Sequence, residues 1–269
     1  MIGEYLQAAI LGAVQGLTEF VPVSSSGHLV VVRELFHLPD QGLAFDAVLH
    51  LATALAVLIY FWADWESMIT NFFTRRQVRE AKQARKLLSL IIVTTVPAIG
   101  AGLLWAGYLE AQLRNITIVA SLMILTGLFF ILIERISKPH RDLNKLTFFD
   151  ALSIGLAQAL AILPGISRSG ATIMTGMYHG LKRDTAARYA FLAAGPIVVL
   201  AGFYSLWQLF SAPVSNIEIV ELAIGFITSL LVGLVAIHFL LSWLKQNRLY
   251  IFAGYLILAG AGLIIFCLF

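Results

Sequence analysis

The sequence predicts an all-α polytopic membrane protein: an inverted-topology repeat with about six full spans and two re-entrant helix–loop–helix hairpins. Three observations lead to this fold class. The 269 residues are 59% hydrophobic and only 12% charged, with a mean hydropathy of +0.88, whereas soluble domains carry about 25% charged residues. Long apolar stretches recur along the chain, and two further apolar stretches are interrupted by similar motifs. A soluble globular protein is therefore excluded.

Six apolar stretches are candidates for full spans, since about 20 helical residues cross a hydrocarbon core roughly 30 Å thick. The single cysteine, Cys267, lies in the last stretch, so neither an internal disulfide nor a cysteine zinc site is expected. Glu4 stands where a secretory signal carries Lys or Arg, so we expect the N-terminal segment to belong to the mature protein. The predicted spans lie near Phe45–Trp62, Leu87–Gly107, Ile116–Glu134, Tyr189–Leu209, Ile219–Leu241 and Tyr250–Phe269.

The two interrupted stretches, at about 5–36 and 150–180, are each predicted to form two helices joined by a loop. The interruptions read VPVSSSG and LPGISRSG, in which Pro, Gly and Ser break a helix. Non-helical backbone at membrane depth is tolerated only inside a protein or along a water-filled cavity. We therefore expect both loops to line a site.

The two interrupted stretches also indicate an internal duplication within a single membrane domain, 1–269, with repeat one at about 1–140 and repeat two at about 141–269. An odd number of spans between the copies inverts the second copy relative to the first. This arrangement is typical of transporters with a site near the bilayer midplane. A shift of 143 positions pairs Gly12 with Gly155, Gln15 with Gln158, Leu17 with Leu160, Ser24 with Ser167, Ser26 with Ser169 and Gly27 with Gly170.

Basic residues predict the orientation, because cytoplasmic loops carry an excess of Lys and Arg. If the 63–86 loop is cytoplasmic, 15 of the 18 basic residues fall inside, and the three others are Arg33, Arg114 and Arg168. Both termini are then expected outside the cytoplasm. The 15 residues are Arg75, Arg76, Arg79, Lys82, Arg85, Lys86, Arg135, Lys138, Arg141, Lys145, Lys182, Arg183, Arg188, Lys245 and Arg248.

Two charged residues, Glu19 and Arg168, fall at membrane depth at the equivalent interruptions of the two repeats. A charge there costs at least about 2.5–3.5 kcal/mol on insertion scales, so each needs a partner or a function. One interpretation is a buried ion pair that holds the hairpin tips together. The other is a reaction centre, because both residues have polar neighbours. Near Glu19 lie Gln15, on the same helix face, and then Ser24, Ser25, Ser26, Gly27 and His28; near Arg168 lie Ser167, Ser169, Gly170 and Thr172.

These residue types predict chemistry on an oxyanion, with phosphate as the favoured ligand. They supply a carboxylate for a cation or proton, hydroxyl nucleophiles, an imidazole and a guanidinium that fits phosphate oxygens. The interruptions open onto helix N-termini, whose backbone N–H groups bind anions. Packing and capping are the alternative roles of Ser24 and Ser26, because Ser is common at contacts between membrane helices. His50, Thr53, Tyr178, His179 and His238 are assigned only packing or substrate contact.

Two motifs resemble those of a known family: (E/Q)xxxE followed by PxSSxGH, here Gln15–Glu19 and Pro22–His28, and PGxSRSGxT, here Pro164–Thr172. With these motifs, and over nearly its whole length, the sequence resembles the undecaprenyl-diphosphate phosphatases of the bacitracin-resistance type. The resemblance implies removal of the terminal phosphate of a long-chain lipid diphosphate, which returns the lipid carrier to cell-wall synthesis. It also implies a divalent cation, Mg²⁺ or Ca²⁺, and a plasma-membrane site that opens to the outer face.

The resemblance also assigns roles to residues of this chain. It implies a nucleophile at Ser25, an acid/base at His28, and an acidic motif at Gln15 and Glu19 that holds the cation. Gln15 occupies a position that is often Glu, so such a cation has one carboxylate less here. Near the C-terminus, Tyr255 is followed by Leu256 where the family often has Arg. The implied phosphate clamp is Ser167, Arg168, Ser169 and Thr172, and we expect Ser24, Ser26, Gly27 and Gly170 beside it.

Several alternatives stay open at this point. The reaction proceeds either by attack of Ser25, with Glu19 or His28 as base, or by attack of a water that one of them activates. A lipid-carrier flippase or transporter is the rival function, because inverted repeats with broken helices occur in transporters. A second lipid phosphatase superfamily requires His six positions after the motif arginine, where this chain has Met174. The expected partners are the lipid diphosphate and the bilayer, without nucleic acid; the sequence leaves a homo-oligomer open.

Overall fold

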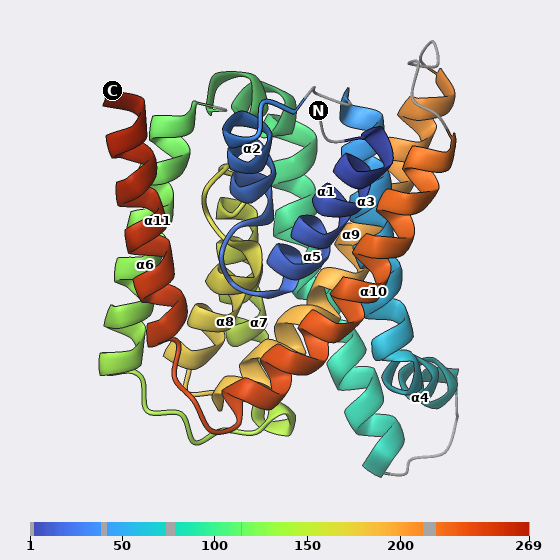
Figure 1. Ribbon diagram of the computed structural model, residues 1–269. Helices are drawn as coiled ribbons and strands as arrows, with labels where there is room; N and C mark the ends of the chain where they lie inside the picture. Colours follow the sequence, from blue (N-terminus) through green and yellow to red (C-terminus); the bar gives the residue numbers. More distant parts are fainter. Residues whose placement is uncertain (1–2, 39–41, 74–78, 114, 212–218, 269) are drawn as a thin grey trace.

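The computed structural model describes residues 3–38, 42–73, 79–113, 115–211 and 219–268, so Arg75, Arg76 and Arg114 lie outside the described part. Within these ranges the chain is helical and forms no strand beyond an isolated bridge between Arg141 and Leu181 (Figure 1). The all-α class is therefore confirmed. The helices are α1 Glu4–Phe20, α2 Ser25–Leu35, α3 Gly42–Tyr60, α4 Trp62–Phe73, α5 Arg79–Leu113, α6 Ile116–Ile136, the 3₁₀ turn η1 Leu143–Lys145, α7 Phe148–Leu160, α8 Arg168–Tyr178, α9 Arg183–Ser211, α10 Ile219–Leu244 and α11 Tyr250–Leu268.

Several helices have the length and composition of membrane spans. Among the described residues, four qualify alone: Arg79–Leu104, Ile116–Ile136, Ile219–Leu244 and Tyr250–Cys267. α3 and α4 qualify as a pair, bent by 68° at their junction. The remaining predicted span, near Tyr189–Leu209, falls within α9, whose side chains at 201 and 203–211 are outside the described part. The chain is thus a polytopic membrane protein, and its described part contains four to five apolar span candidates.

The predicted 63–86 loop contains a helix, α4, that the sequence-based interpretation missed. α4 fills most of its first half, and α5 begins at Arg79. α4 escaped prediction because its 12 residues are too few for a full span and include the charged Asp64. Met68 is buried, whereas Trp62, Ile69 and Phe73 are exposed, so the helix contacts the protein on one side only.

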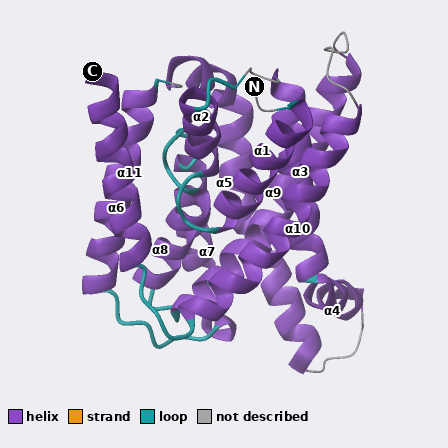
Figure 2. Ribbon diagram, viewed as in Figure 1, coloured by secondary structure: helices purple, strands orange, loops and turns teal. Residues whose placement is uncertain are grey.

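Both interrupted stretches form helix–loop–helix hairpins, as predicted. α2 spans 25–35 and α8 spans 168–178, so both of their ends are 143 positions apart. Figure 2 shows the two connecting loops inside the helical body. In Figure 1, α2 lies toward the end of the molecule that carries both termini, and α8 toward the opposite end. The hairpins therefore enter the protein from opposite ends.

Helix packing is reciprocal between the two halves. α1 packs against α10, and α7 packs against α5. α3 contacts α9, and α6 contacts α11. Gly12 and Gly155, which the 143-position shift pairs, make equivalent close contacts. An added Cβ at Gly12 would lie 2.5 Å from the carbonyl oxygen of Gly225, and one at Gly155 would lie 2.6 Å from that of Thr94. A duplication is expected to give such equivalent contacts in its two copies. The inverted repeat itself stays a prediction.

The molecule has two distinct ends. Both termini lie at one end, and α4, the start of α5, and the α6–α7 and α10–α11 connections lie at the other (Figure 1). Glu134 ties the second end together, because its buried carboxylate accepts hydrogen bonds from Arg183 at 2.5 and 2.8 Å and from the Leu249 N–H at 2.9 Å. The described segments that carry the predicted cytoplasmic charges therefore share one end of the molecule.

Candidate active site

A cavity of about 300 Å³ lies where the tips of the two hairpins meet. Its walls come from four parts of the chain. The first hairpin contributes only polar side chains, and the second hairpin and α9 contribute the apolar ones. The lining residues are Thr18, Glu19, Ser24, Ser25 and Ser26 of the first hairpin, His50 of α3, Ala161, Ile162, Ile166, Ser167 and Arg168 of the second hairpin, and Val198 of α9.

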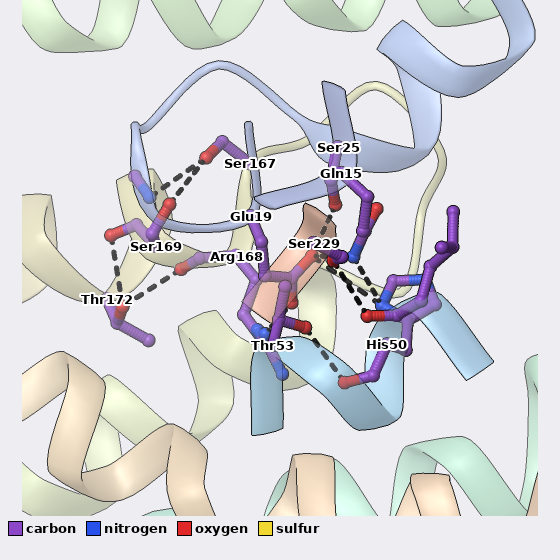
Figure 3. A network of polar contacts seen from close by, with 12 residues as sticks. Gln15, Glu19, Ser25, His50, Thr53, Ser167, Arg168, Ser169, Thr172 and Ser229 are labelled. Atoms are coloured by element: carbon purple, nitrogen blue, oxygen red, sulfur yellow. Dashed lines mark hydrogen bonds and ion pairs between the residues drawn. The ribbon is translucent and has the colours of Figure 1, made fainter. Parts of the chain in front are cut away.

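Glu19 is the centre of the polar network in this cavity (Figure 3). Its Oε1 forms an ion pair with Nη2 of Arg168. Its Oε2 accepts hydrogen bonds from Ser25 Oγ at 2.6 Å and from Gln15 Nε2 at 2.9 Å. A carboxylate, a hydroxyl and a guanidinium from two distant segments therefore meet at one point.

The local backbone explains how Ser25 reaches Glu19. α1 ends at Phe20, and Pro22 follows within the loop, so the chain turns back. Ser24 precedes the first residue of α2 without capping the helix through its side chain, and it has φ 74 and ψ 95, a conformation that is uncommon for a residue other than glycine. Ser25 is then the first residue of α2, so its hydroxyl and the free N–H groups of the first turn lie at the cavity.

The second hairpin presents Arg168 in the same way, as the first residue of α8. Ser167 caps this helix, because its Oγ accepts a hydrogen bond from the Gly170 N–H at 3.1 Å. The Ser169 hydroxyl lies 3.1 Å from that of Ser167, and Thr172 Oγ1 donates to the Arg168 carbonyl at 2.9 Å. Two helix N-termini therefore open onto one cavity, and both carry partial positive charge.

The structure brings only some of the predicted site residues to the cavity wall. Ser24, Ser25 and Ser26 line it with Glu19, as do Ser167 and Arg168. The other predicted site residues do not line the cavity: Gln15, Gly27, His28, Ser169, Gly170 and Thr172. Gln15 contacts Glu19, and Gly170 packs so tightly that an added Cβ would lie 2.8 Å from the Phe130 ring.

His28 is directed away from the cavity. Its Nδ1 lies 2.7 Å from the Ser24 carbonyl oxygen, and its Nε2 lies 2.6 Å from the Tyr255 hydroxyl of α11. His28 and Ser25 are three positions apart in α2, a spacing that favours a shared helix face. The ring nevertheless contacts the turn that precedes Ser25 and makes no hydrogen bond with the serine itself.

His50 is a cavity residue to which the sequence assigned only packing or substrate contact. Its Nδ1 lies 2.9 Å from Gln15 Nε2 and 3.6 Å from Glu19 Oε2. An amide N–H donates, so Nδ1 accepts, and the hydrogen of the neutral ring is then on Nε2. The sequence signal for a role of His50 in the site was its position as a polar residue within an apolar span. Its contact with Gln15 could not be predicted, because the two residues are 35 positions apart.

The residues around Glu19 include few candidate ligands for a divalent cation. Two buried side-chain oxygens, Gln15 Oε1 and Ser24 Oγ, have no hydrogen-bond partner among the described residues. Within the same residues, no group of three His, Cys, Asp or Glu side chains could hold a metal alone. One carboxylate with neutral oxygens suits Mg²⁺, which usually keeps several waters and completes its shell with substrate phosphate.

The fold and the site together define a multi-pass helical membrane protein with a glutamate–serine–arginine centre at the tips of two hairpins. The family model described as "Bacitracin resistance protein BacA" matches residues 8–262. The chain belongs to this family.

Curated relatives extend over nearly the whole chain. The chain is 41% identical to a protein named undecaprenyl-diphosphatase from Corynebacterium glutamicum, covering 95% of this chain and 88% of the relative. A protein of the same name from Rubrobacter xylanophilus is 41% identical over 94% of each chain. A third, from Saccharophagus degradans, is 38% identical over 97% of each chain.

Proposed function

We propose that this protein is a membrane phosphatase that hydrolyses undecaprenyl diphosphate to undecaprenyl phosphate and phosphate, and so recycles the lipid carrier of cell-wall synthesis. The observation that carries the proposal is the 2.6 Å hydrogen bond from Ser25 to Glu19, which is itself paired with Arg168. A nucleophile, a base and an anion clamp therefore share one cavity. Family membership and the name of the curated relatives support the same activity.

The geometry supports a reaction in which Ser25 attacks. Glu19 takes the Ser25 proton while Oγ forms a bond to the terminal phosphorus, and the bridging P–O bond breaks to release prenyl phosphate. Water then hydrolyses the phosphoserine, which returns the proton to Ser25 and releases phosphate. Phosphoryl transfer needs mainly positioning and positive charge on the peripheral oxygens. Attack by a water activated by Glu19 is the alternative chemistry.

Arg168 can contact phosphate without leaving Glu19. A guanidinium has five N–H donors, and the ion pair uses Nη2. The Arg168 side chain is 26% exposed, whereas that of Glu19 is 5% exposed, so the arginine presents part of its surface to the cavity. The N-termini of α2 and α8 add N–H donors on either side.

We propose Glu19 as the protein ligand of a divalent cation, Mg²⁺ or Ca²⁺, with Gln15 nearby. Glu19 is the carboxylate of the cavity wall, and Gln15, whose Nε2 donates to it, has a buried Oε1 without a partner among the described residues. When bound, the cation supplies positive charge that offsets the charge of the diphosphate.

We propose further that the protein lies in the plasma membrane with both termini outside and that its two halves form an inverted repeat. The end of the molecule opposite the termini carries the basic loops, which supports a cytoplasmic position for that end. The cavity is then reached from the outer side, where the spent lipid carrier is released. The flippase alternative gains no support from the names of the relatives.

Phosphate release from labelled undecaprenyl diphosphate by the purified protein tests the proposal. We expect turnover by the wild type, loss of turnover in Ser25→Ala, and normal turnover in Ser121→Ala. Ser121 is a suitable control because it lies in α6, outside the cavity, and its hydroxyl donates to the Thr117 carbonyl. Absence of phosphate release by folded wild-type protein with Mg²⁺ and Ca²⁺ present would refute the function.

A further inference from the structure

A chain of hydrogen bonds connects α11 with the turn that precedes Ser25. The His28 and Tyr255 rings stack with centroids 5.6 Å apart and an interplanar angle of 17°. The Ser24 carbonyl can only accept, so His28 Nδ1 carries the hydrogen of the 2.7 Å bond. Nε2 of the neutral ring then accepts from the Tyr255 hydroxyl at 2.6 Å. Both ring nitrogens are occupied, and the residue is not part of the cavity wall.

The carbonyl that His28 holds belongs to a strained residue. Ser24 and His37 are the residues other than glycine that have positive φ in the described part of the chain. The Ser24 side chain does not stabilise this turn itself, because its Oγ has no partner among the described residues. The Ser24 carbonyl instead accepts from the His28 N–H at 3.2 Å and from the His28 ring. Strained backbone persists only where its surroundings fix it.

The orientation of this turn determines where Ser25 lies. The Ser24 carbonyl and the Ser25 nitrogen belong to the same planar peptide, so rotation of that carbonyl moves the Ser25 backbone with it. The Ser25 hydroxyl has one short contact to Glu19, at 2.6 Å, which tolerates little displacement.

We propose that His28 and Tyr255 are positioning residues: they hold the Ser24 peptide and thereby keep the Ser25 hydroxyl on Glu19. His28 then transfers no proton in the reaction. Tyr255 lies in α11, so the second half of the chain helps to orient the nucleophile of the first half. This inference rests on the proposed phosphatase function.

Two variants of His28 separate positioning from proton transfer. In His28→Asn, the amide Nδ2 replaces Nδ1 and can still donate to the Ser24 carbonyl, but the side chain does not titrate. We expect this variant to keep kcat within about tenfold of wild type, the range of one neutral hydrogen bond. In His28→Ala we expect kcat to fall about 100-fold with little change in KM, as for a nucleophile displaced by about 1 Å. Tyr255→Phe should lower kcat about two- to tenfold, since it removes one hydrogen bond.

The pH dependence supplies a second readout. We expect the pH profile of kcat/KM for His28→Asn to have the same shape as that of the wild type, whichever limbs that profile has. A second His–Tyr pair provides a matched control for Tyr255→Phe, because the Tyr60 hydroxyl lies 3.1 Å from His238 Nδ1, outside the cavity. Tyr60→Phe should leave kcat unchanged.

The outcomes distinguish the inference from the function. If folded His28→Asn is as inactive as His28→Ala, or if it loses a limb of the pH profile, His28 transfers a proton and the inference is wrong. If His28→Ala does not fold, the activity and pH profile of His28→Asn and the kcat of Tyr255→Phe decide the matter. If the wild type itself releases no phosphate, the proposed function fails instead.

Discussion

The Glu19–Arg168 pair gives the most decisive test of the site. A structural role and a chemical role both predict that a substitution of either residue alone lowers activity, so a double variant is needed to separate them. Glu19→Gln keeps the size of the side chain but removes its charge. In the structure this carboxylate accepts from Arg168, Ser25 and Gln15, so the substitution weakens three contacts together. It also leaves Arg168 partly buried without its counter-ion.

The expected losses can be estimated. Breaking a buried ion pair by removing one partner costs about 3–5 kcal/mol of unfolding free energy. Because 26% of the Arg168 side chain is exposed, we expect the lower end, about 3 kcal/mol. Loss of a general base lowers the rate by about 10²–10⁴-fold. At about 1.4 kcal/mol for each factor of ten, this loss corresponds to about 3–5 kcal/mol of activation free energy.

The double variant Glu19→Gln with Arg168→Gln separates the two roles. Removing both charges leaves no uncompensated buried ion, so we expect its thermal stability in detergent to recover toward that of wild type. Its release of phosphate from undecaprenyl diphosphate should stay at least about 100-fold below wild type, because base and clamp are both lost. Substantial phosphatase activity in the stable double variant would return both residues to a purely structural role.

Three further predictions concern the clamp, the cation and the orientation. Arg168→Lys should fold and should retain less than about 1% of the wild-type activity, since an ammonium keeps the charge but lacks the planar fork that binds two phosphate oxygens; recovery of activity would exclude a bidentate clamp. Excess chelator should abolish phosphate release, and added Mg²⁺ or Ca²⁺ should restore it; full activity in chelator would exclude the cation. A cysteine at exposed Glu80, in a chain with Cys267→Ser, should react with an impermeant thiol reagent only after cells are opened; labelling of intact cells would reverse the proposed orientation.

The hairpins could be predicted because their signals are local. Pro22 and Pro164 stand within a few residues of Ser and Gly, and such a cluster ends a helix whatever surrounds it. The meeting of Glu19 and Arg168 could be predicted because both lie at the interruptions of the two stretches, which the predicted hairpins bring together. Charge reduces the number of candidate site residues further, because few residues at membrane depth are charged.

The neighbours of these residues could not be predicted, because they depend on which helix faces meet. The Tyr255 contact with His28 joins residues 227 positions apart, and the apolar pattern of α11 does not mark one face as buried. His50 presents the same difficulty within α3. The direction of the His28 ring was also beyond sequence reasoning, since its spacing from Ser25 suggested a shared face. Side-chain partners of this kind follow from tertiary packing alone.

The charge balance of the cavity connects the geometry with the expected need for a cation. Glu19 and Arg168 are the charged pair of the cavity wall, and their charges cancel. The remaining fixed positive charge comes from the N-termini of α2 and α8, about half an elementary charge each. A lipid diphosphate carries more negative charge than these two helix ends can offset in a medium where ions are poorly screened. We therefore expect the site to bind its substrate well only when a cation accompanies it, and this charge balance is the physical basis of the chelator prediction.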